Sequence, residues 1–205
     1  MTAPTTMPKF SKENSERRRI AKQARRLSLR VLIVCGAAET EKQYLEGVKG
    51  LYRNPAVAVK IKTRDKSPLE VVRYAAAFSK SDKDDFDEVW AVFDVDEFDI
   101  AEAVREAAKS NVNVAVSNPC FEFWLLLHFV NRRGHLNSYK QANALLCKHL
   151  RDYDKAQLDF ANFQDKIDIA CARAKDIDET REKPYANPSS GMWRVIGQIS
   201  PGSHA

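Results

Sequence analysis

The sequence predicts an α/β fold with a central, mainly parallel four-stranded sheet flanked by helices. Three observations favour this class. Short apolar runs alternate with segments of helical periodicity in the order βαβαβαβα along residues 29–131. The stretch between successive runs is long enough for a crossover helix, which parallel neighbours require. The first run is apolar on both faces, as expected of a strand covered by helices on either side.

Four segments have the composition of strands. The first is a β-branched run that ends in Gly and Ala, and the second, AVAVKIKT, alternates apolar and basic residues from Val59 to Lys62. The third is a short apolar run that stops at two aspartates, and the fourth ends in Ser-Asn-Pro. The predicted strands cover residues 29–38, 56–63, 88–93 and 112–116.

Helices are predicted after each strand. Glu39 and Thr40 stand at the N-cap and first turn of the first helix, and Ser67 with Glu70 forms a capping-box pattern at the start of the second. The third and fourth cover residues 100–110 and 121–130, and the fourth is apolar enough to dock on the sheet. Beyond residue 131 the pattern weakens to helices at 138–150, 160–176 and 191–199, with a turn region at 184–190.

This pattern divides the chain into a basic arm (1–28), an α/β core (29–131) and a helical C-terminal extension packed on the core (132–205). The net charge is +5, but residues 1–30 alone carry nine Lys or Arg against two acidic residues. The arm can therefore bind nucleic-acid phosphates by releasing counterions, or it can be a charged solubilising extension, and charge alone favours neither. The candidate phosphate-binding residues are Arg17, Arg18, Arg19, Lys22, Arg25 and Arg26.

The four cysteines are far apart and form no CxxC pair, so we expect reduced thiols in or near the core. Together with a start that lacks the apolar stretch of a secretion signal, this predicts a cytoplasmic protein. No run of 18 apolar residues is present, so no membrane span is expected. Glycine-rich phosphate loops are also absent, which disfavours a nucleotide-binding protein.

Asp94 and Asp96 are the strongest candidates for chemistry. They follow directly on the third apolar run, and the reactive groups of open parallel sheets gather beyond the carboxyl ends of the strands. Two carboxylates held on one side of an extended segment repel each other and favour a hard cation such as Mg²⁺ or Mn²⁺. The alternative is an acidic loop that caps the next helix, with Asp99 as its N-cap.

A third carboxylate should complete this site. Glu41 lies in the first turn of the helix after the first strand, Glu39 competes with it, and Glu122 follows the fourth strand. The residues alone leave this choice open. His128 lies six residues after Glu122 and so points to a different helix face, which indicates a buried structural histidine. The aromatic residues of this helix, Phe121, Phe123 and Trp124, are assigned to the core rather than to base stacking.

Several blocks together resemble the RloB family. They are VLIVCG, ETEKQYLEG, VWAVFDVDEFD, SNPCFEFWLLLHF and PYANPSS, and the resemblance covers about residues 30–199. RloB proteins are encoded beside restriction–modification genes and are similar to the second component of the AbiL abortive-infection pair. The family is grouped with the Mg²⁺-dependent Toprim fold. The matching positions are Thr40, Glu41, Asp94, Asp96, Ser117, Asn118, Pro119, Phe121, Glu122, Trp124 and His128.

The resemblance implies a Toprim-like metal site with a Glu after the first strand and the aspartate pair after the third. Family members commonly have Glu-Gly after the first strand, whereas this chain has Gly36 followed by Ala37. We therefore expect a metal-dependent nuclease of DNA or RNA in anti-phage defence, in which Glu41, Asp94 and Asp96 hold Mg²⁺ or Mn²⁺. The alternative is a degenerate Toprim domain that binds nucleic acid or a neighbouring AAA-type ATPase.

Overall fold

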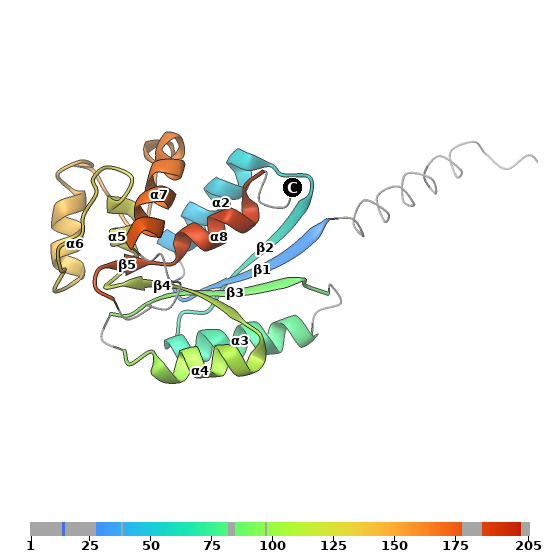
Figure 1. Ribbon diagram of the computed structural model, residues 1–205. Helices are drawn as coiled ribbons and strands as arrows, with labels where there is room; N and C mark the ends of the chain where they lie inside the picture. The colour runs from blue at the N-terminus through green and yellow to red at the C-terminus, as the bar shows by residue number, and fades with distance from the viewer. Residues whose placement is uncertain are drawn as a thin grey trace, which may run out of the picture.

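The computed structural model describes Asn14 and residues 28–37, 39–81, 85–96, 98–177 and 186–201. The arm residues named above, from Arg17 to Arg26, lie outside this part of the chain. The described residues form a sheet with the strand order β2-β1-β3-β4-β5 (Figure 1). The strands are β1 (Leu29–Cys35), β2 (Val57–Thr63), β3 (Glu88–Asp94), β4 (Asn113–Asn118) and β5 (Ser189–Ser190).

The sheet is parallel except at one edge. β1 pairs in parallel with β2 and β3, and β3 pairs in parallel with β4. The predicted four-stranded parallel sheet is thus confirmed, and a fifth strand is added. β5 has two residues, runs antiparallel to β4, and lies within the segment predicted to be only a turn.

Helices cover both faces of the sheet (Figure 1). On one face lie α3 (Pro68–Ser81) and α4 (Ala101–Ser110), and on the other lie α2 (Thr40–Tyr52), α7 (Ile167–Ile177) and α8 (Met192–Ile199). α5 (Phe121–Leu126) and α6 (Tyr139–Leu146) lie beyond the carboxyl ends of the strands. The fold is therefore Toprim-like: a mainly parallel sheet with helices on both sides.

Alternate residues of β1 explain its uninterrupted apolar run. Val31 and Ile33 belong to the core beneath α2 and α8, whereas Leu32 and Val34 belong to the core beneath α3 and α4. All four side chains are fully buried. Successive side chains of a strand point to opposite faces, so a strand between two helical layers must be apolar at every position.

The later helices differ from their predicted lengths. The apolar helix expected over 121–130 ends at Leu126, where the chain continues as a turn with bonds from His128 N–H to the Leu125 carbonyl and from Phe129 N–H to the Leu126 carbonyl. The helix expected over 138–150 ends at Leu146. The helix expected over 160–176 consists of two 3₁₀ turns, Phe160–Asn162 and Gln164–Lys166, followed by α7.

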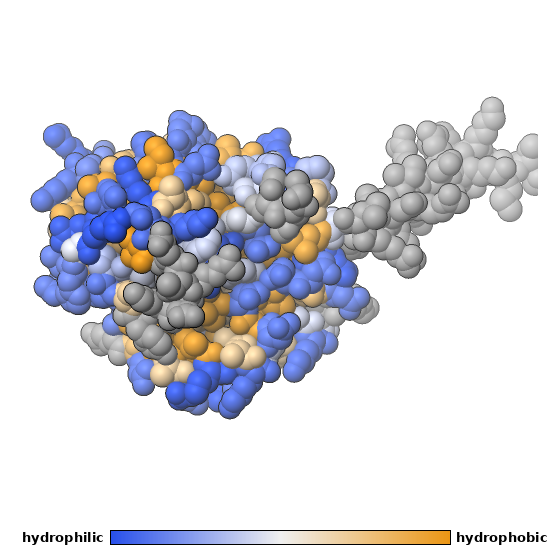
Figure 2. All heavy atoms as spheres, in the orientation of Figure 1, coloured by the Kyte–Doolittle hydropathy of each residue, from blue (hydrophilic) through white to orange (hydrophobic). Residues whose placement is uncertain are grey.

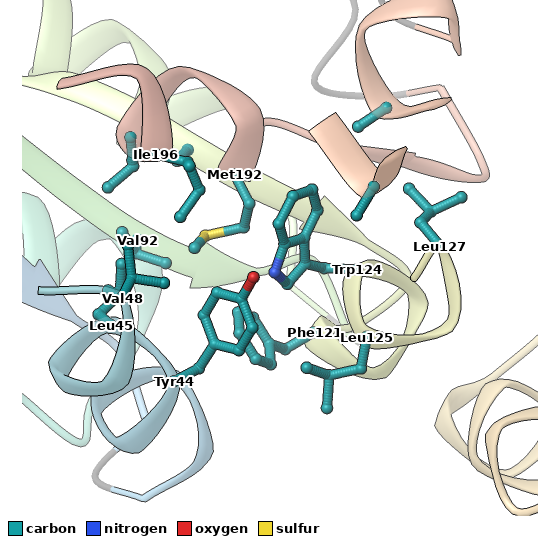
Figure 3. Packing of buried hydrophobic residues seen from close by; sticks show 14 of the residues in the cluster. Tyr44, Leu45, Val48, Val92, Phe121, Trp124, Leu125, Leu127, Met192 and Ile196 are labelled. Carbon is teal, nitrogen blue, oxygen red and sulfur yellow. The ribbon is translucent and has the colours of Figure 1, made fainter. Parts of the chain in front are cut away.

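The segment after residue 131 shares the core of the sheet. Met192 and Ile196 of α8 pack against Leu45, Val48 and Val92 (Figure 3). Polar and apolar side chains are interspersed on the molecular face in Figure 2. Within the described residues, no helix is both long and apolar enough to cross a membrane. All four cysteines are free thiols, two of them buried, as predicted.

Candidate functional site

The carboxyl ends of β1, β3 and β4 meet at one edge of the sheet, and Asp94 lies there as the last residue of β3, opposite Ser117 of β4. The pairing continues beyond the strand, since Val95 N–H donates to the Ser117 carbonyl at 3.0 Å and Asp96 N–H donates to the Pro119 carbonyl at 3.0 Å. Asp96 has a left-handed backbone, with φ at 42°, so it lies in a turn rather than in an extended segment. Strand pairing therefore fixes both aspartates at this edge.

Asp94 is partly buried among other acidic groups. Its carboxylate accepts a hydrogen bond from the backbone N–H of Phe121, at the start of α5. Burial raises the pKa of Asp94 well above its ordinary value, and the nearby carboxylates of Glu41 and Glu122 raise it further. Asp94 therefore lies within an acidic cluster, which we define as Glu41, Asp94, Asp96 and Glu122.

Glu41 contributes to this cluster from the first turn of α2. Its side chain is only 2% exposed and accepts hydrogen bonds from its own N–H and from a backbone group of Ala37. Burial raises the pKa of Glu41 to about 7, and the neighbouring Glu122 and Asp96 add to the shift. Glu39, the competing candidate, is exposed at the N-cap of the same helix. The structure thus places Glu41, and not Glu39, beside the aspartates.

Glu122 contributes the fourth carboxylate, from the first turn of α5. It is 4% exposed, and it accepts a hydrogen bond from the Tyr153 hydroxyl at 3.1 Å and one from the Cys120 thiol. Burial raises the pKa of Glu122, while these bonds and the charge of Lys155 oppose the shift. Tyr153 and Lys155 were missed in the sequence, where they lie in a segment without periodicity.

The segment that carries Tyr153 and Lys155 is fastened to the start of α2. Thr40 Oγ1 donates to the Lys155 carbonyl at 2.9 Å, and the Gln43 side chain bonds both Ala156 and Leu158. A chain segment more than 100 residues away in sequence thus closes one side of the acidic cluster.

An aromatic cluster holds α2 against α5 and so positions two of the carboxylates. Tyr44 lies one turn after Glu41, and its ring meets those of Phe121 and Trp124 edge to face, with centroids 5.7 and 5.9 Å away (Figure 3). Phe121 directly precedes Glu122. These rings are buried, which confirms their assignment to the core.

His128 belongs to this aromatic cluster and not to the acidic one. Its Nδ1 lies 3.1 Å from the Trp124 carbonyl, which can only accept, so Nδ1 donates and Nε2 accepts the hydroxyl of Tyr44 at 2.9 Å. Burial lowers the pKa of His128 to about 4, so the ring is neutral at physiological pH. The prediction of a buried, satisfied histidine is confirmed.

Gly36 occupies the position where the resemblance leads one to expect a glutamate. Its N–H donates to the Val92 carbonyl at 2.7 Å, and a Cβ added there would lie 3.2 Å from Cβ of Phe93. A side chain at this position would need β3 to shift by a few tenths of an ångström. The chain carries its buried glutamate five residues later, at Glu41.

The donor set of the acidic cluster suits a hard divalent cation. It offers only carboxylate oxygens, the ligands of Mg²⁺ and Mn²⁺, and a cation would relieve their mutual repulsion. Among the described residues, no three His, Cys, Asp or Glu side chains are already arranged to hold an ion. In the alternative, Asp99 was predicted to be the N-cap of α4, but the N-cap is Ile100; Asp99 lies one residue before it, and its Oδ1 accepts the N–H of Ala101 at 2.9 Å.

Fold and cluster together define a Toprim-like α/β domain with four carboxylates at the carboxyl edge of its sheet. The chain belongs to the RloB-like protein family, whose model matches residues 31–199. No curated protein and no solved structure gives a significant match.

Proposed function

We propose that the protein is a divalent-metal-dependent nuclease that hydrolyses phosphodiester bonds of DNA or RNA in the bacterial cytoplasm as part of anti-phage defence. The observation that carries this proposal is the grouping of Glu41, Asp94, Asp96 and Glu122 at one edge of the sheet, with two of them almost fully buried. Buried like charges destabilise a fold, so their presence together favours a role that needs them.

Each carboxylate has a role that its surroundings favour. Asp94, Asp96 and Glu41 would hold Mg²⁺ or Mn²⁺, which when bound polarises the scissile phosphate and stabilises the developing charge. Without a bound cation, burial raises the pKa of Glu41 to about 7; a cation beside it would favour the ionised carboxylate, the form that binds metal. The Tyr153 hydroxyl donates to Oε1 of Glu122 and thereby fixes the orientation of the whole carboxylate.

Basic side chains on the edge strand β2 and directly after it support a nucleic-acid partner. Lys60 and Lys62 lie 5.0 and 5.3 Å from the ring centre of Phe78, and Arg64 lies 5.6 Å from that of Tyr74. β2 is parallel to β1, so this row of basic side chains runs toward the carboxyl ends of the strands, where the acidic cluster lies. Lysines on an edge strand also prevent that strand from pairing with the sheet of another molecule, a role that needs no nucleic acid. The basic arm remains a second candidate for phosphate binding.

A second candidate function is a non-catalytic partner or sensor that binds nucleic acid or an AAA-type ATPase. Gly36 favours it, because a carboxylate is missing directly after β1. In this case the acidic cluster would bind metal without supporting hydrolysis.

Cleavage assays distinguish the two. Purified full-length protein is incubated with plasmid DNA, single-stranded DNA and RNA in the presence of Mg²⁺ or Mn²⁺. Asp94→Asn and Asp96→Asn should each lower cleavage by about 100-fold or more, a loss typical of removing a group that stabilises developing charge. Asp99→Asn is the matched control, because it removes the same charge from the same loop and the amide oxygen of Asn can still accept the N–H of Ala101.

The nuclease proposal fails if Asp94→Asn cleaves as fast as the unaltered protein. Absence of cleavage of every substrate, together with retained nucleic-acid or ATPase binding, would favour the partner function instead.

A further inference from the structure

A cleft of about 780 Å³ opens beside the acidic cluster. Asp96 and Pro119 line it on the side of the sheet, and Phe98 extends from the same loop. Tyr139 and Lys140, at the start of α6, form part of the other wall. Asp96 belongs to both the cluster and the cleft, so a molecule in the cleft would touch the proposed metal site.

Phe98 is unusual for an aromatic residue in this fold. It is 50% exposed, and it is the one aromatic among the strongly exposed large apolar side chains of the described residues. Its N–H donates to the Val95 carbonyl at 2.8 Å, and the side chain of Asp99, directly after it, accepts the N–H of Ala101 at the start of α4. Hydrogen bonds thus hold the chain on both sides of Phe98 while its ring remains outside the core.

Tyr139 offers a second ring within the cleft. It is partly buried, and the Lys155 ammonium lies 5.6 Å from its ring centre. Lys140, the next residue, is exposed and lines the same cleft. Two aromatic rings and one cation therefore lie together beside four carboxylates.

We propose that this cleft binds an unstacked base of single-stranded nucleic acid, next to the phosphate that meets the acidic cluster. The base lies against Phe98, Tyr139 or both, and Lys140 pairs with a backbone phosphate. This inference rests on the proposed function and adds the substrate class to it, single strands rather than duplexes.

The size and position of the cleft support this substrate. Its volume lies within the range of sites that enclose small organic ligands, about 300–1,000 Å³. Phe98 follows Asp96 by two residues, so their Cα atoms are at most about 7 Å apart. A base on the ring and a phosphate at Asp96 can thus belong to one nucleotide or to neighbours. In a duplex the base faces are covered by stacking, so only an unpaired or extruded base can reach the rings.

Binding measurements test the inference separately from cleavage. The full chain carrying Asp94→Asn is titrated against a fluorescein-labelled 12-nucleotide single strand and against the duplex of the same sequence. We expect tighter binding of the single strand. Phe98→Ala or Tyr139→Ala should weaken it by about 5- to 150-fold, the range for loss of one stacked base. Phe98→Tyr and Tyr139→Phe should restore most of the affinity, because they keep the ring.

Two further variants make the test specific. Lys140→Ala should reduce the salt dependence of single-strand binding by about 0.7 in the log–log slope, as expected for one lost phosphate contact. Ile169→Ala, which removes an equally exposed apolar side chain from α7, should leave binding unchanged. An iodouracil-substituted strand should cross-link on irradiation to the peptide that contains Phe98 or the one that contains Tyr139.

Equal affinity for the duplex, or unchanged single-strand affinity after both rings are removed, would overturn the inference. The inference would also be overturned if the oligonucleotide did not bind while a protein segment or a mononucleotide occupied the cleft. None of these results affects the nuclease proposal, which depends on whether the protein cleaves nucleic acid with Asp94 intact.

Discussion

Replacing Glu41 by Gln should make the protein more stable at alkaline pH while abolishing its proposed activity. Glu41 is almost fully buried, and burial together with Glu122 and Asp96 raises its pKa to about 7 from an ordinary value of 4.5. The folded state therefore holds this proton more tightly than the unfolded chain. Its contribution to stability is complete below pH 4.5 and is lost as the pH rises through 7.

The magnitude follows from the two pKa values. Their difference corresponds to about 3 kcal/mol of unfolding free energy once the pH is well above 7. Gln has no charge to lose, and its carbonyl oxygen can still accept the hydrogen bonds of the Glu41 carboxylate. Glu41→Gln should therefore gain up to about 3 kcal/mol at pH 8.5, or roughly 6–12 °C in melting temperature for a chain of this size.

Urea unfolding at two pH values, with a chelator present, measures the effect. The advantage of Glu41→Gln should shrink to less than about 1 kcal/mol at pH 5, where the native carboxyl is already mostly protonated. Glu39→Gln is the matched control, because it removes an exposed charge from the same helix start. It should be neutral or slightly destabilising, since an acidic residue at a helix N-terminus contributes about 0.3–1 kcal/mol. The reasoning is refuted if Glu41→Gln also lowers stability at pH 8.5.

Three more outcomes are expected. A Cβ on Gly47 would lie 2.3 Å from the Phe160 ring, so Gly47→Ala should lower the free energy of unfolding in urea by about 1–3 kcal/mol. A Cβ on Gly50 meets nothing within 4 Å, so Gly50→Ala should raise it by about 0.5–1 kcal/mol. Burial lowers the pKa of His128 to about 4, so its contribution to stability is complete above pH 6.5 and is lost as the pH falls through 4. The free energy of unfolding of His128→Gln should therefore fall by about 3 kcal/mol less than that of the unaltered protein between these pH values. Mn²⁺ at 100 times the Kd of the unaltered protein should stabilise that protein by about 2.7 kcal/mol in thermal unfolding. An equal gain in Asp94→Asn at the same Mn²⁺ concentration would contradict the metal site.

The sheet could be predicted from the sequence because its signals are local. β1 is apolar at every position from Val31 to Cys35, and the helices around it repeat apolar residues at helical spacing, so both layers were expected. β5 could not be predicted, since two serines carry no strand pattern and their pairing depends on Ser117 and Asn118 of β4. The early end of α5 at Leu126 is likewise set by tertiary packing, as its composition remains apolar to Val130.

The site was predictable in part. Asp94 was found because it ends a buried strand, a position that sequence context reveals. The choice of Glu41 over Glu39 was left open, although the helix phase carried a signal: Glu41 shares the buried face of α2 with Tyr44, Leu45 and Val48, at spacings of three, four and seven residues. Tyr153 and Lys155 gave no signal, because their place depends on contacts between distant segments.

The buried face of α2 links stability to the proposed chemistry. A charged Glu41 on that face costs folding free energy, and the same face carries Tyr44, whose ring contacts five aromatic neighbours including His128. The aromatic contacts stabilise the α2–α5 interface, and they offset the repulsion between Glu41 and Glu122 that the same interface imposes. If the aromatic contacts were weakened, water could reach both carboxylates, and both pKa values would fall toward their ordinary values because burial is the main cause of both shifts. The aromatic packing around Tyr44, one helical turn after Glu41, therefore holds the acidic cluster together despite the repulsion between its carboxylates.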